Sequence, residues 1–293
     1  MSRKDEVEKY VEHCYQQVLK RPVDPNGKEH YVTEILEHQI QSEALPNILR
    51  GSREYKERFR KETDFKHVLV VTPVRKAARW LPFFRGSFER LSYPREKLSF
   101  AFAVGQASDD SYGHVSKFKE TFKNVTIGHV NLPGHNRFMK LTQIRNKIIE
   151  ENLKDQEYVW SIDSDIVNFP PNILDQLIDH DVDIVAPLVL IEGTNRFYDI
   201  LAFLYQGKQF THALPYCPAC KRNELFEVDS VGTCYLARSD IFKQGIKYST
   251  HEGKISEQIC FCQEARKKGF KIWVDPTIKV LHANLPKYGE RFH

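Results

Sequence analysis

The sequence predicts an α/β protein in which a mostly parallel sheet is covered by helices on both faces, preceded by a small all-helical domain. From His67 onward, short apolar runs alternate with amphipathic helical segments, which is the pattern of a parallel α/β sheet. The residues before this point are rich in charge, and their apolar side chains recur at helical spacing. We therefore expect a helical domain over residues 1–62 and an α/β domain over residues 66–293.

The composition is that of an ordinary globular chain. Of its 293 residues 41% are hydrophobic, and the net charge of +4 permits an anionic substrate without demanding nucleic acid. The charged N-terminus through Lys9 lacks the apolar run of a signal peptide, and no stretch resembles a membrane span. Since the chain has six cysteines and no such leader, we expect free thiols, a reducing compartment and a cytoplasmic location.

The first domain should consist of short helices around a small apolar core. Turn-forming residues at 21–27 separate the first helix from the next, and Asp24 there is interpreted as part of a capped turn. The segments with helical apolar spacing are 10–19, 31–40 and 44–49. We expect this domain to serve in docking or oligomerisation.

The second domain should alternate strands with helices. The expected strands are residues 68–71, 98–104, 125–127, 158–166, 183–191, 197–210, 227–237, 271–274 and 278–281. The expected helices are residues 80–88, 138–153, 173–178 and 256–268. Pro170 and Pro171 suit the start of the third of these helices, and Gly269 suits the end of the fourth.

Polar residues follow several of the expected strands. These residues are Thr72–Arg75, Ser108–Ser111, Asp163–Asp165 and His282. Because ligands of open α/β sheets bind beyond the carboxyl ends of the strands, we expect the four groups to converge on one site.

Asp163 and Asp165 are the candidate metal ligands. In an extended strand, residues two apart face the same side and lie roughly 6 to 7 Å apart, so both carboxylates could face one ion. Their hard oxygen atoms suit Mg²⁺ or Mn²⁺ that also carries a substrate phosphate. The alternative is that the two aspartates merely end the strand as turn formers.

The order of these motifs resembles the GT-A class of nucleotide-sugar glycosyltransferases over about residues 67–285. One set of segments resembles the fungal mannan-polymerase mannosyltransferases: 72–75, 145–146, 160–167, 170–171 and 185–187. Residues 81–84 and 91–97, with the same aspartates, resemble the collagen galactosyltransferase domain. Residues 256–262, Gly269 and 273–282 are similar to the closing segment of bacterial and phage sugar transferases. Residues 19–27 and 51–55 resemble a small helical domain of unknown function found in bacterial proteins.

The resemblance implies a GT-A fold and a metal-dependent transfer of a sugar from a UDP- or GDP-linked donor. Asp165 would bind Mn²⁺ or Mg²⁺ directly, Asp163 would reach the ion through water or bind the donor ribose, and His282 would complete the site. A divalent ion is suited to this chemistry because negative charge develops on the departing diphosphate.

Further residues are implied on the nucleotide side. Thr72, Pro73 and Arg75 would lie beside the nucleotide, with Asp109 and Asp110 near its base or ribose. For the two aspartates, turn formation is the structural alternative.

Arg145 would pair with Asp163 or with a donor phosphate. A plain surface salt bridge is the alternative for this arginine.

The catalytic half of the site departs from the resemblance. Where inverting relatives have Glu-Asp, with the Asp acting as general base, this chain has Glu257 and Gln258, and Gln258 cannot accept a proton. Either Glu257 is the base, or the reaction retains configuration, or the enzyme is weak; Glu257 could also serve only as an acid at a helix start. Asp229, followed by Gly232 and Thr233, resembles the acceptor-side strand, with an ordinary bulge as the alternative.

Cys217 and Cys220 form a Cys-x-x-Cys pair with spacing suitable for structural zinc. The remaining ligands would have to come from His212, Cys234, Cys260 or Cys262, so free thiols are the competing interpretation.

Two other functions compete with the transferase. A sugar nucleotidyltransferase shares the alternating architecture, but the expected Gly-rich loop is missing from residues 72–75. A non-catalytic carbohydrate- or partner-binding protein on a decayed transferase fold is consistent with Gln258. The acceptor of a transferase stays open among glycan, protein, lipid and modified nucleic-acid base.

Overall fold

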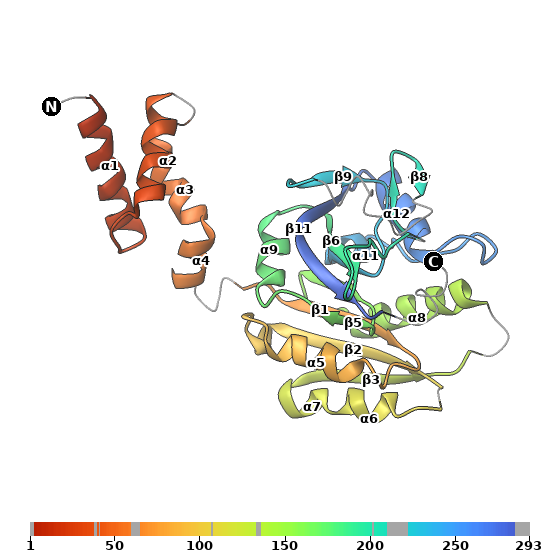
Figure 1. The fold of residues 1–293 in the computed structure, drawn as a ribbon. Helices are drawn as coiled ribbons and strands as arrows, with labels where there is room; N and C mark the ends of the chain where they lie inside the picture. Colours follow the sequence, from red (N-terminus) through yellow and green to blue (C-terminus); the bar gives the residue numbers. More distant parts are fainter. Residues whose placement is uncertain are drawn as a thin grey trace. The chain divides into compact units, whose positions relative to one another are not determined.

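The computed structural model describes residues 3–37, 40, 42–59, 65–106, 108–132, 136–200, 202–209 and 222–284. The chain divides into two compact units, Met1–Phe65 and Lys66–His293, drawn as a helical part and a part built on a sheet in Figure 1.

The first unit is a small helical bundle. Its helices are α1 (Arg3–Val18), α2 (Pro25–Leu36), the 3₁₀ turn η1 (Ser42–Ala44), α3 (Leu45–Gly51) and α4 (Arg53–Phe59). Val11, Tyr15 and Leu45 belong to its buried apolar cluster. The Asp24 carboxylate accepts a 2.8 Å hydrogen bond from the Gly27 amide and thereby caps α2, which satisfies a backbone donor at the helix start.

A mixed sheet forms the centre of the second unit. Its strands are β1 (Val68–Val74), β2 (Leu98–Gly105), β3 (Asn124–Val130), β4 (Tyr158–Ile162), β5 (Ile166–Asn168), β6 (Ile184–Ile191), β9 (Phe226–Val228), β10 (Cys234–Arg238) and β11 (Ile272–His282). The strand order is β3-β2-β1-β4-β10-β6-β11-β5, with β9 paired to β11. Strands β3, β2, β1 and β4 are parallel, whereas β10 runs antiparallel between β4 and β6. The predicted fold class, a mostly parallel mixed sheet with covering helices, is confirmed.

The helices of this unit follow the predicted alternation. They are α5 (Leu81–Glu89), the 3₁₀ turn η3 (Arg95–Lys97), α6 (Ser111–Ser116), α7 (Phe118–Thr121), α8 (Arg137–Asn152), α9 (Ile173–Asp179), α11 (Ser239–Lys243) and α12 (Glu257–Lys267). Figure 1 shows α6 and α7 together beside β3, with α8 on a different side of the same strands.

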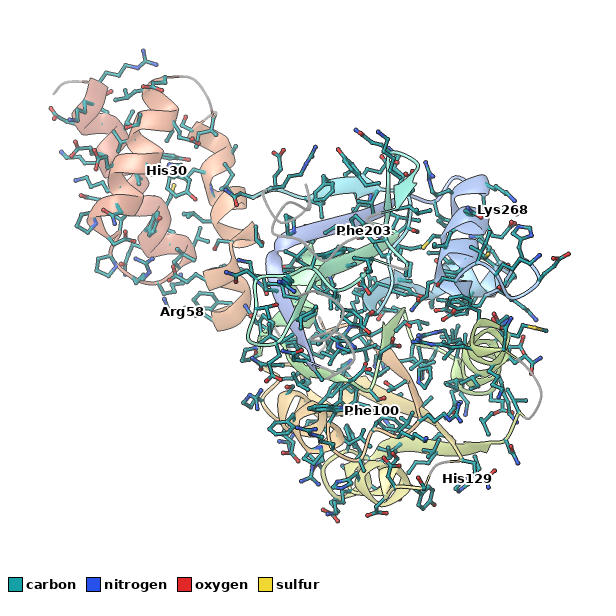
Figure 2. The ribbon with its side chains drawn as sticks, turned by 45° about the vertical axis from the view of Figure 1, so that its right-hand side comes forward. His30, Arg58, Phe100, His129, Phe203 and Lys268 are labelled. Carbon is teal, nitrogen blue, oxygen red and sulfur yellow. The ribbon has the colours of Figure 1, made fainter. Side chains whose placement is uncertain are left out.

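Alternation along the strands separates two cores. Phe100 and Phe102 of β2 face an aromatic cluster that contains Phe88 and Phe118, and Phe100 lies in the interior in Figure 2. Residues at the alternate positions of β1, β2 and β4 belong to the apolar cluster of the opposite face, which includes Ile148 of α8. In β4 this second face carries Val159, so Ser161 also points toward α8.

Three strand predictions were wrong in detail. The described residues 197–200 and 202–209 do not form one strand; a short hairpin, β7 (Leu204–Tyr205) and β8 (Lys208–Gln209), turns at Gly207, where φ is 71°. Residues 227–237 are divided between β9 and β10 instead. The two strands expected over 271–281 are one strand, β11, whose pairing with β6 shifts register between Asp275 and Lys279, next to a proline that lacks an N–H donor.

The expected strand 158–166 is also interrupted. Strand β4 ends at Ile162, a turn carries Asp163 to Asp165, and the short β5 begins at Ile166. The Ile166 amide donates to the Asp163 carbonyl over 3.2 Å, which closes this turn. The premise that both aspartates point to one side of an extended strand is therefore wrong.

Replacement of Phe88 by alanine should destabilise the second unit strongly. Phe88 is 1% exposed and contacts the rings of Phe84, Phe100 and Trp160 among others, so truncation leaves a cavity that costs about 3 to 5 kcal/mol. Denaturant unfolding followed by tryptophan fluorescence measures this unit alone, because all three tryptophans lie after residue 66. Phe83→Ala on the same helix, with Phe83 59% exposed, is the control and should change stability by less than about 0.5 kcal/mol. Equal losses in the two variants would contradict this packing.

Candidate functional site

Arg145 on α8 joins three distant segments in the interior. Its Nη1 donates to the Ser161 hydroxyl over 2.9 Å, its Nη2 to Asp163 Oδ1 over 2.6 Å, and its Nε to Glu257 Oε1 over 3.1 Å. The arginine side chain is only 1% exposed, and that of Glu257 is 2% exposed. Arg145 is therefore a buried ion-pair centre that fixes the turn after β4 and the start of α12.

The two carboxylates keep Arg145 in its charged form. Burial of Arg145 opposes its charge, but the Asp163 and Glu257 carboxylates outweigh burial and hold the pKa of Arg145 above its ordinary value. Burial raises the pKa of Glu257, which Arg145 only partly offsets. Its Oε2 has no hydrogen-bond partner within the described part of the chain.

Asp165 and His282 form a second pair at the same edge of the sheet. His282 Nδ1 lies 2.8 Å from the Ala283 carbonyl oxygen, to which it donates, and Nε2 lies 3.1 Å from Asp165 Oδ1. In the neutral ring, Nε2 then carries no proton, and Asp165 Oδ1 is buried without a hydrogen-bond donor among the described residues. Two lone-pair atoms thus face each other and call for a cation between them, either a proton or a metal ion.

The contact between Asp165 and His282 shifts the pKa values of both groups. Burial opposes both charges, yet the attraction between the groups outweighs it. The pKa of His282 is therefore raised and the pKa of Asp165 is lowered.

A pocket of about 400 Å³ opens beside this pair. Its walls come from the ends of β1 and β2, from α8 and from the turn after β4. The residues that line it are Pro73, Val74, Arg75, Gly105, Arg137, Lys140, Leu141, Ile144, Asp163, Ser164 and Asp165. Three cationic side chains and two carboxylates in one pocket suit a phosphate-bearing ligand held with a divalent ion.

A smaller pocket of about 60 Å³ adjoins the first. Arg137, Leu141 and Asp163 line both pockets. The smaller one is completed by residues from α8, from the loop after β6, from the start of β10 and from α12: Phe138, Arg145, Tyr198, Asp199, Ile200, Ala202, Thr233, Ser256, Glu257 and Gln258. The two pockets are therefore neighbours that share Asp163 in their walls.

Asp199 is the most unusual carboxylate of the smaller pocket. It is 6% exposed, and Thr233 donates to it from both the hydroxyl and the amide, the amide reaching Oδ1 over 3.1 Å. Burial raises the pKa of Asp199 to about 6 despite these bonds; Asp163 also raises it, and His282 acts in the opposite sense. Tyr198, the preceding residue, stacks on His282 with 3.5 Å between ring centroids, which places Asp199 next to the Asp165–His282 pair.

Of the residues expected beside the nucleotide, Asp109 and Asp110 hold loops and a helix start in place. Asp109 accepts from the Ser111 hydroxyl over 2.7 Å and from the Ala78 amide over 3.1 Å, and so ties two strand-end loops together. Asp110 caps α6 by accepting from the Gly113 amide over 3.1 Å. Thr72 is fully buried in β1, and its hydroxyl has no hydrogen-bond partner in the described residues. These three side chains do not line either pocket, whereas Pro73 and Arg75 line the larger one.

Asp229 lies apart from the converging residues. Its carboxylate accepts from the Gly207 amide over 2.6 Å and pairs with Arg266 over 2.7 Å, and it lines neither pocket. Glu257 and Gln258 do line the smaller pocket. The Ser256 hydroxyl, which caps α12, also contacts the Gln258 side chain at 3.3 Å.

The candidate zinc ligands Cys217, Cys220 and His212 lie outside the described residues. Cys234, Cys260 and Cys262 are buried free thiols. In the part of the chain that the structure describes, no group of three or more His, Cys, Asp and Glu side chains could hold a metal ion unaided.

Sequence reasoning missed Arg137, Lys140, Tyr198 and Asp199. Arg137 and Lys140 lie at the start of α8, and the placement of that helix next to strand ends could have suggested them as phosphate ligands. Asp199 lies in a loop that was read as a strand, so no sequence signal marked it.

Two family models match parts of the chain. Residues 129–212 match the Anp1 family, and residues 3–59 match a domain of unknown function, DUF4214. Among curated relatives, human procollagen galactosyltransferase 2 is 31% identical over 43% of this chain and 23% of its own length. The mannan polymerase II complex anp1 subunit of Schizosaccharomyces pombe is 26% identical over 42% of this chain and 34% of its own length. The chain thus matches about a quarter to a third of these relatives.

Solved structures show the same fold at low identity. The mannosyltransferase PcManGT of Pyrobaculum calidifontis, in complex with GDP-Man and Mn²⁺, is 12% identical with a TM-score of 0.51 over 96% of this chain and 70% of that one. GalNAc-T7 with UDP, GalNAc and Mn²⁺ is 13% identical with a TM-score of 0.56 over 77% of this chain and 44% of that one. TarS of S. aureus with UDP-GlcNAc is 14% identical with a TM-score of 0.51 over 74% of this chain and 58% of that one. The GT-A fold predicted from the sequence is confirmed.

Within the described residues, no helix combines the length and apolar character that crossing a bilayer requires.

Arg145→Met should lower the stability of the second unit by about 3 to 5 kcal/mol, because the buried Glu257 and the partly exposed Asp163 lose their counter-charge. Tryptophan-monitored denaturation measures the change, and adding Glu257→Gln should recover part of it. Lys247→Met is the control: Lys247 pairs with Glu150, the two side chains are 60% and 53% exposed, and the loss should be at most about 1 kcal/mol. A loss in Arg145→Met no larger than in this control would show that the ion pairs do not hold the site together.

Asp199→Asn should stabilise the chain at pH 7.5 and have a clearly smaller stabilising effect at pH 4.5. The native pKa of about 6 exceeds the ordinary 3.8, so the folded state binds this proton more tightly than the unfolded state. Between pH 3.8 and about 6 the unfolded state releases this proton while the folded state retains it, so the wild-type protein loses stability over this window. A pKa higher by about 2 corresponds to a full loss of about 3 kcal/mol, of which about 1 kcal/mol is already present at pH 4.5. Denaturant unfolding at both pH values measures the difference between variant and wild type. A difference that is the same at both pH values would contradict the raised pKa.

Proposed function

We propose that this GT-A protein is a metal-dependent glycosyltransferase that moves a sugar from a UDP- or GDP-linked donor to a hydroxyl acceptor. The observation that carries the proposal is the facing pair of Asp165 and His282, with Asp165 on the wall of a pocket of about 400 Å³ at the strand ends. The names of the curated relatives, a galactosyltransferase and a mannan polymerase subunit, support sugar transfer.

Asp165 and His282 would hold the metal ion, Mn²⁺ or Mg²⁺. Mg²⁺ is commonly bound through one or two carboxylates together with substrate phosphates, and a neutral imidazole suits Mn²⁺. Since the described residues offer no complete protein cage, the donor diphosphate would supply the remaining oxygen ligands. When bound, the ion would stabilise the negative charge that develops on the departing diphosphate.

Asp163 has a different task from Asp165. Arg145 holds its Oδ1 at 2.6 Å, and the carboxylate side chain is 28% exposed toward the pockets. We assign Asp163 to water-mediated contact with the ion or to the donor ribose, and Arg145 to keeping it in position.

The cationic side chains around the larger pocket would receive the nucleoside diphosphate. Arg75 follows β1, while Arg137 and Lys140 lie in the first turns of α8. Guanidinium and ammonium groups donate to phosphate oxygens, and the start of a helix adds a favourable dipole. Gly105, at the end of β2, leaves room for the ligand to approach the backbone.

The two alternative functions explain fewer features of this site. A sugar nucleotidyltransferase would need a phosphate-binding loop after β1, where the chain has Pro73-Val74-Arg75. A non-catalytic carbohydrate-binding protein would not require a metal-ready pair beside cationic groups. The acceptor, whether glycan, protein, lipid or modified nucleic-acid base, would approach from the smaller pocket.

Nucleotide binding that depends on Mn²⁺ and on Asp165 is the expected outcome in calorimetric titrations with UDP and GDP. Wild-type protein should bind one of these nucleotides more tightly with Mn²⁺ than with EDTA. Asp165→Asn and His282→Ala should each weaken binding by at least about 100-fold, because loss of a direct ligand exceeds the loss of an outer partner.

Asp181→Asn is the matched control for these titrations. Asp181 lies before β6, its side chain is 82% exposed, and its φ of 52° is one that asparagine also adopts, so binding should not change. Binding that is indifferent to both Mn²⁺ and Asp165→Asn would contradict the metal site.

A further inference from the structure

We propose that Asp199 accepts the proton of the acceptor hydroxyl during sugar transfer. The inference rests on the proposed function and adds to it a catalytic base from the loop after β6. It also assigns the reaction to direct displacement with inversion at the sugar carbon.

The residues at the start of α12 do not fill this role. Gln258 has no basic atom, and its side chain contacts the Ser256 hydroxyl at 3.3 Å. Glu257 is 2% exposed and gives Oε1 to Arg145 at 3.1 Å, so proton uptake, even at Oε2, which has no hydrogen-bond partner among the described residues, would neutralise the counter-charge of a buried arginine. A carboxylate for this reaction must therefore come from another element of the same pocket.

Asp199 is placed to receive a proton from a ligand in that pocket. Thr233 donates to Oδ1 from its hydroxyl and from its amide, the amide lying at 3.1 Å. The contact of Oδ2 with the same amide is longer, at 3.3 Å, which leaves this oxygen with lone pairs for a further donor. The clamp from Thr233 orients the carboxylate, and Asp199 lines the pocket that adjoins the donor site at Asp163.

The position relative to the metal pair matches a displacement reaction. The ring of Tyr198 stacks on that of His282 with 3.5 Å between the centroids, and Asp199 is the next residue in the chain. A donor with its diphosphate in the larger pocket would have its sugar near Asp163, between the two pockets. An acceptor hydroxyl in the smaller pocket would then lie on the opposite side of the sugar carbon from the diphosphate.

The reaction is balanced without another reactant. The acceptor oxygen forms a bond to the anomeric carbon, and the bond from this carbon to the diphosphate oxygen breaks, its electron pair leaving with the nucleoside diphosphate. The acceptor hydroxyl proton passes to Asp199 Oδ2 and is later released to solvent. With water as acceptor, the products are the free sugar and the nucleoside diphosphate.

The environment of Asp199 suits this task. Burial raises the pKa of its carboxyl to about 6, with Asp163 and His282 nearby and opposed in effect. At neutral pH the group is ionised, and a base whose pKa lies near the working pH is the most effective proton acceptor.

Hydrolysis of nucleotide sugars tests the proposal with water as the acceptor. Wild-type protein with Mn²⁺ is incubated with α-linked UDP-galactose, UDP-N-acetylglucosamine and GDP-mannose, and nucleoside diphosphate release is measured. Asp199→Asn should lower the rate by about 100-fold or more, while the Kd for nucleotide with Mn²⁺ changes by less than about twofold. Proton NMR should detect the β-anomer as the first free sugar, and Asp181→Asn should behave as wild type.

Distinct outcomes overturn distinct claims. No release by wild type from any donor contradicts the proposed function and, with it, this inference. Release that Asp199→Asn retains, or an α-anomer as the first product, overturns the inference alone. Loss of nucleotide binding in the variant assigns Asp199 to binding and also overturns it. If Asp199→Asn does not fold, by thermal denaturation, Asp199→Ala is judged by the same criteria.

Discussion

The buried guanidinium of Arg145 is the interaction on which the rest of the site depends. It connects α8, the turn after β4 and the start of α12, and its partners are 16, 18 and 112 residues away in the sequence. An unpaired charge in the interior costs several kcal/mol, so none of these segments can leave without destabilising the others. The arginine thereby fixes the wall that the two pockets share, and Asp163 takes its position from it.

The same rule explains the contrast between the two aspartates. Asp163 has a permanent cation in Arg145, whereas Asp165 Oδ1 faces the lone pair of His282 and has no hydrogen-bond donor among the described residues. The first carboxylate is therefore held in place by the interior, and the second can accept an exchangeable cation. Asp199 is a third case: burial raises its pKa despite the hydrogen bonds from Thr233, and among the described residues no ion pair is formed with it.

The sequence was informative where local rules decide structure. Strand and helix alternation, the cap at Asp24 and the polar strand ends follow from periodicity and turn chemistry, and Asp165 and His282 were found by their places after strands. The split of the Asp163–Asp165 segment between two partners depends on α8 and β11, which are distant in sequence. Asp199 was missed for a related reason: the loop after β6 is positioned by tertiary contacts to Thr233 and His282, and its apolar residues imitate a strand.

The position of β11 has a consequence for how the protein is made. This strand carries His282 and lies between β6 and β5, yet ribosomal synthesis produces it well after both. Until it emerges, the wholly buried strand β6 has an open edge on that side, where its unpaired backbone N–H and C=O groups can pair with another chain. Pairing of Asp165 with His282 and protection of this edge are thus one event, because both need β11 in place.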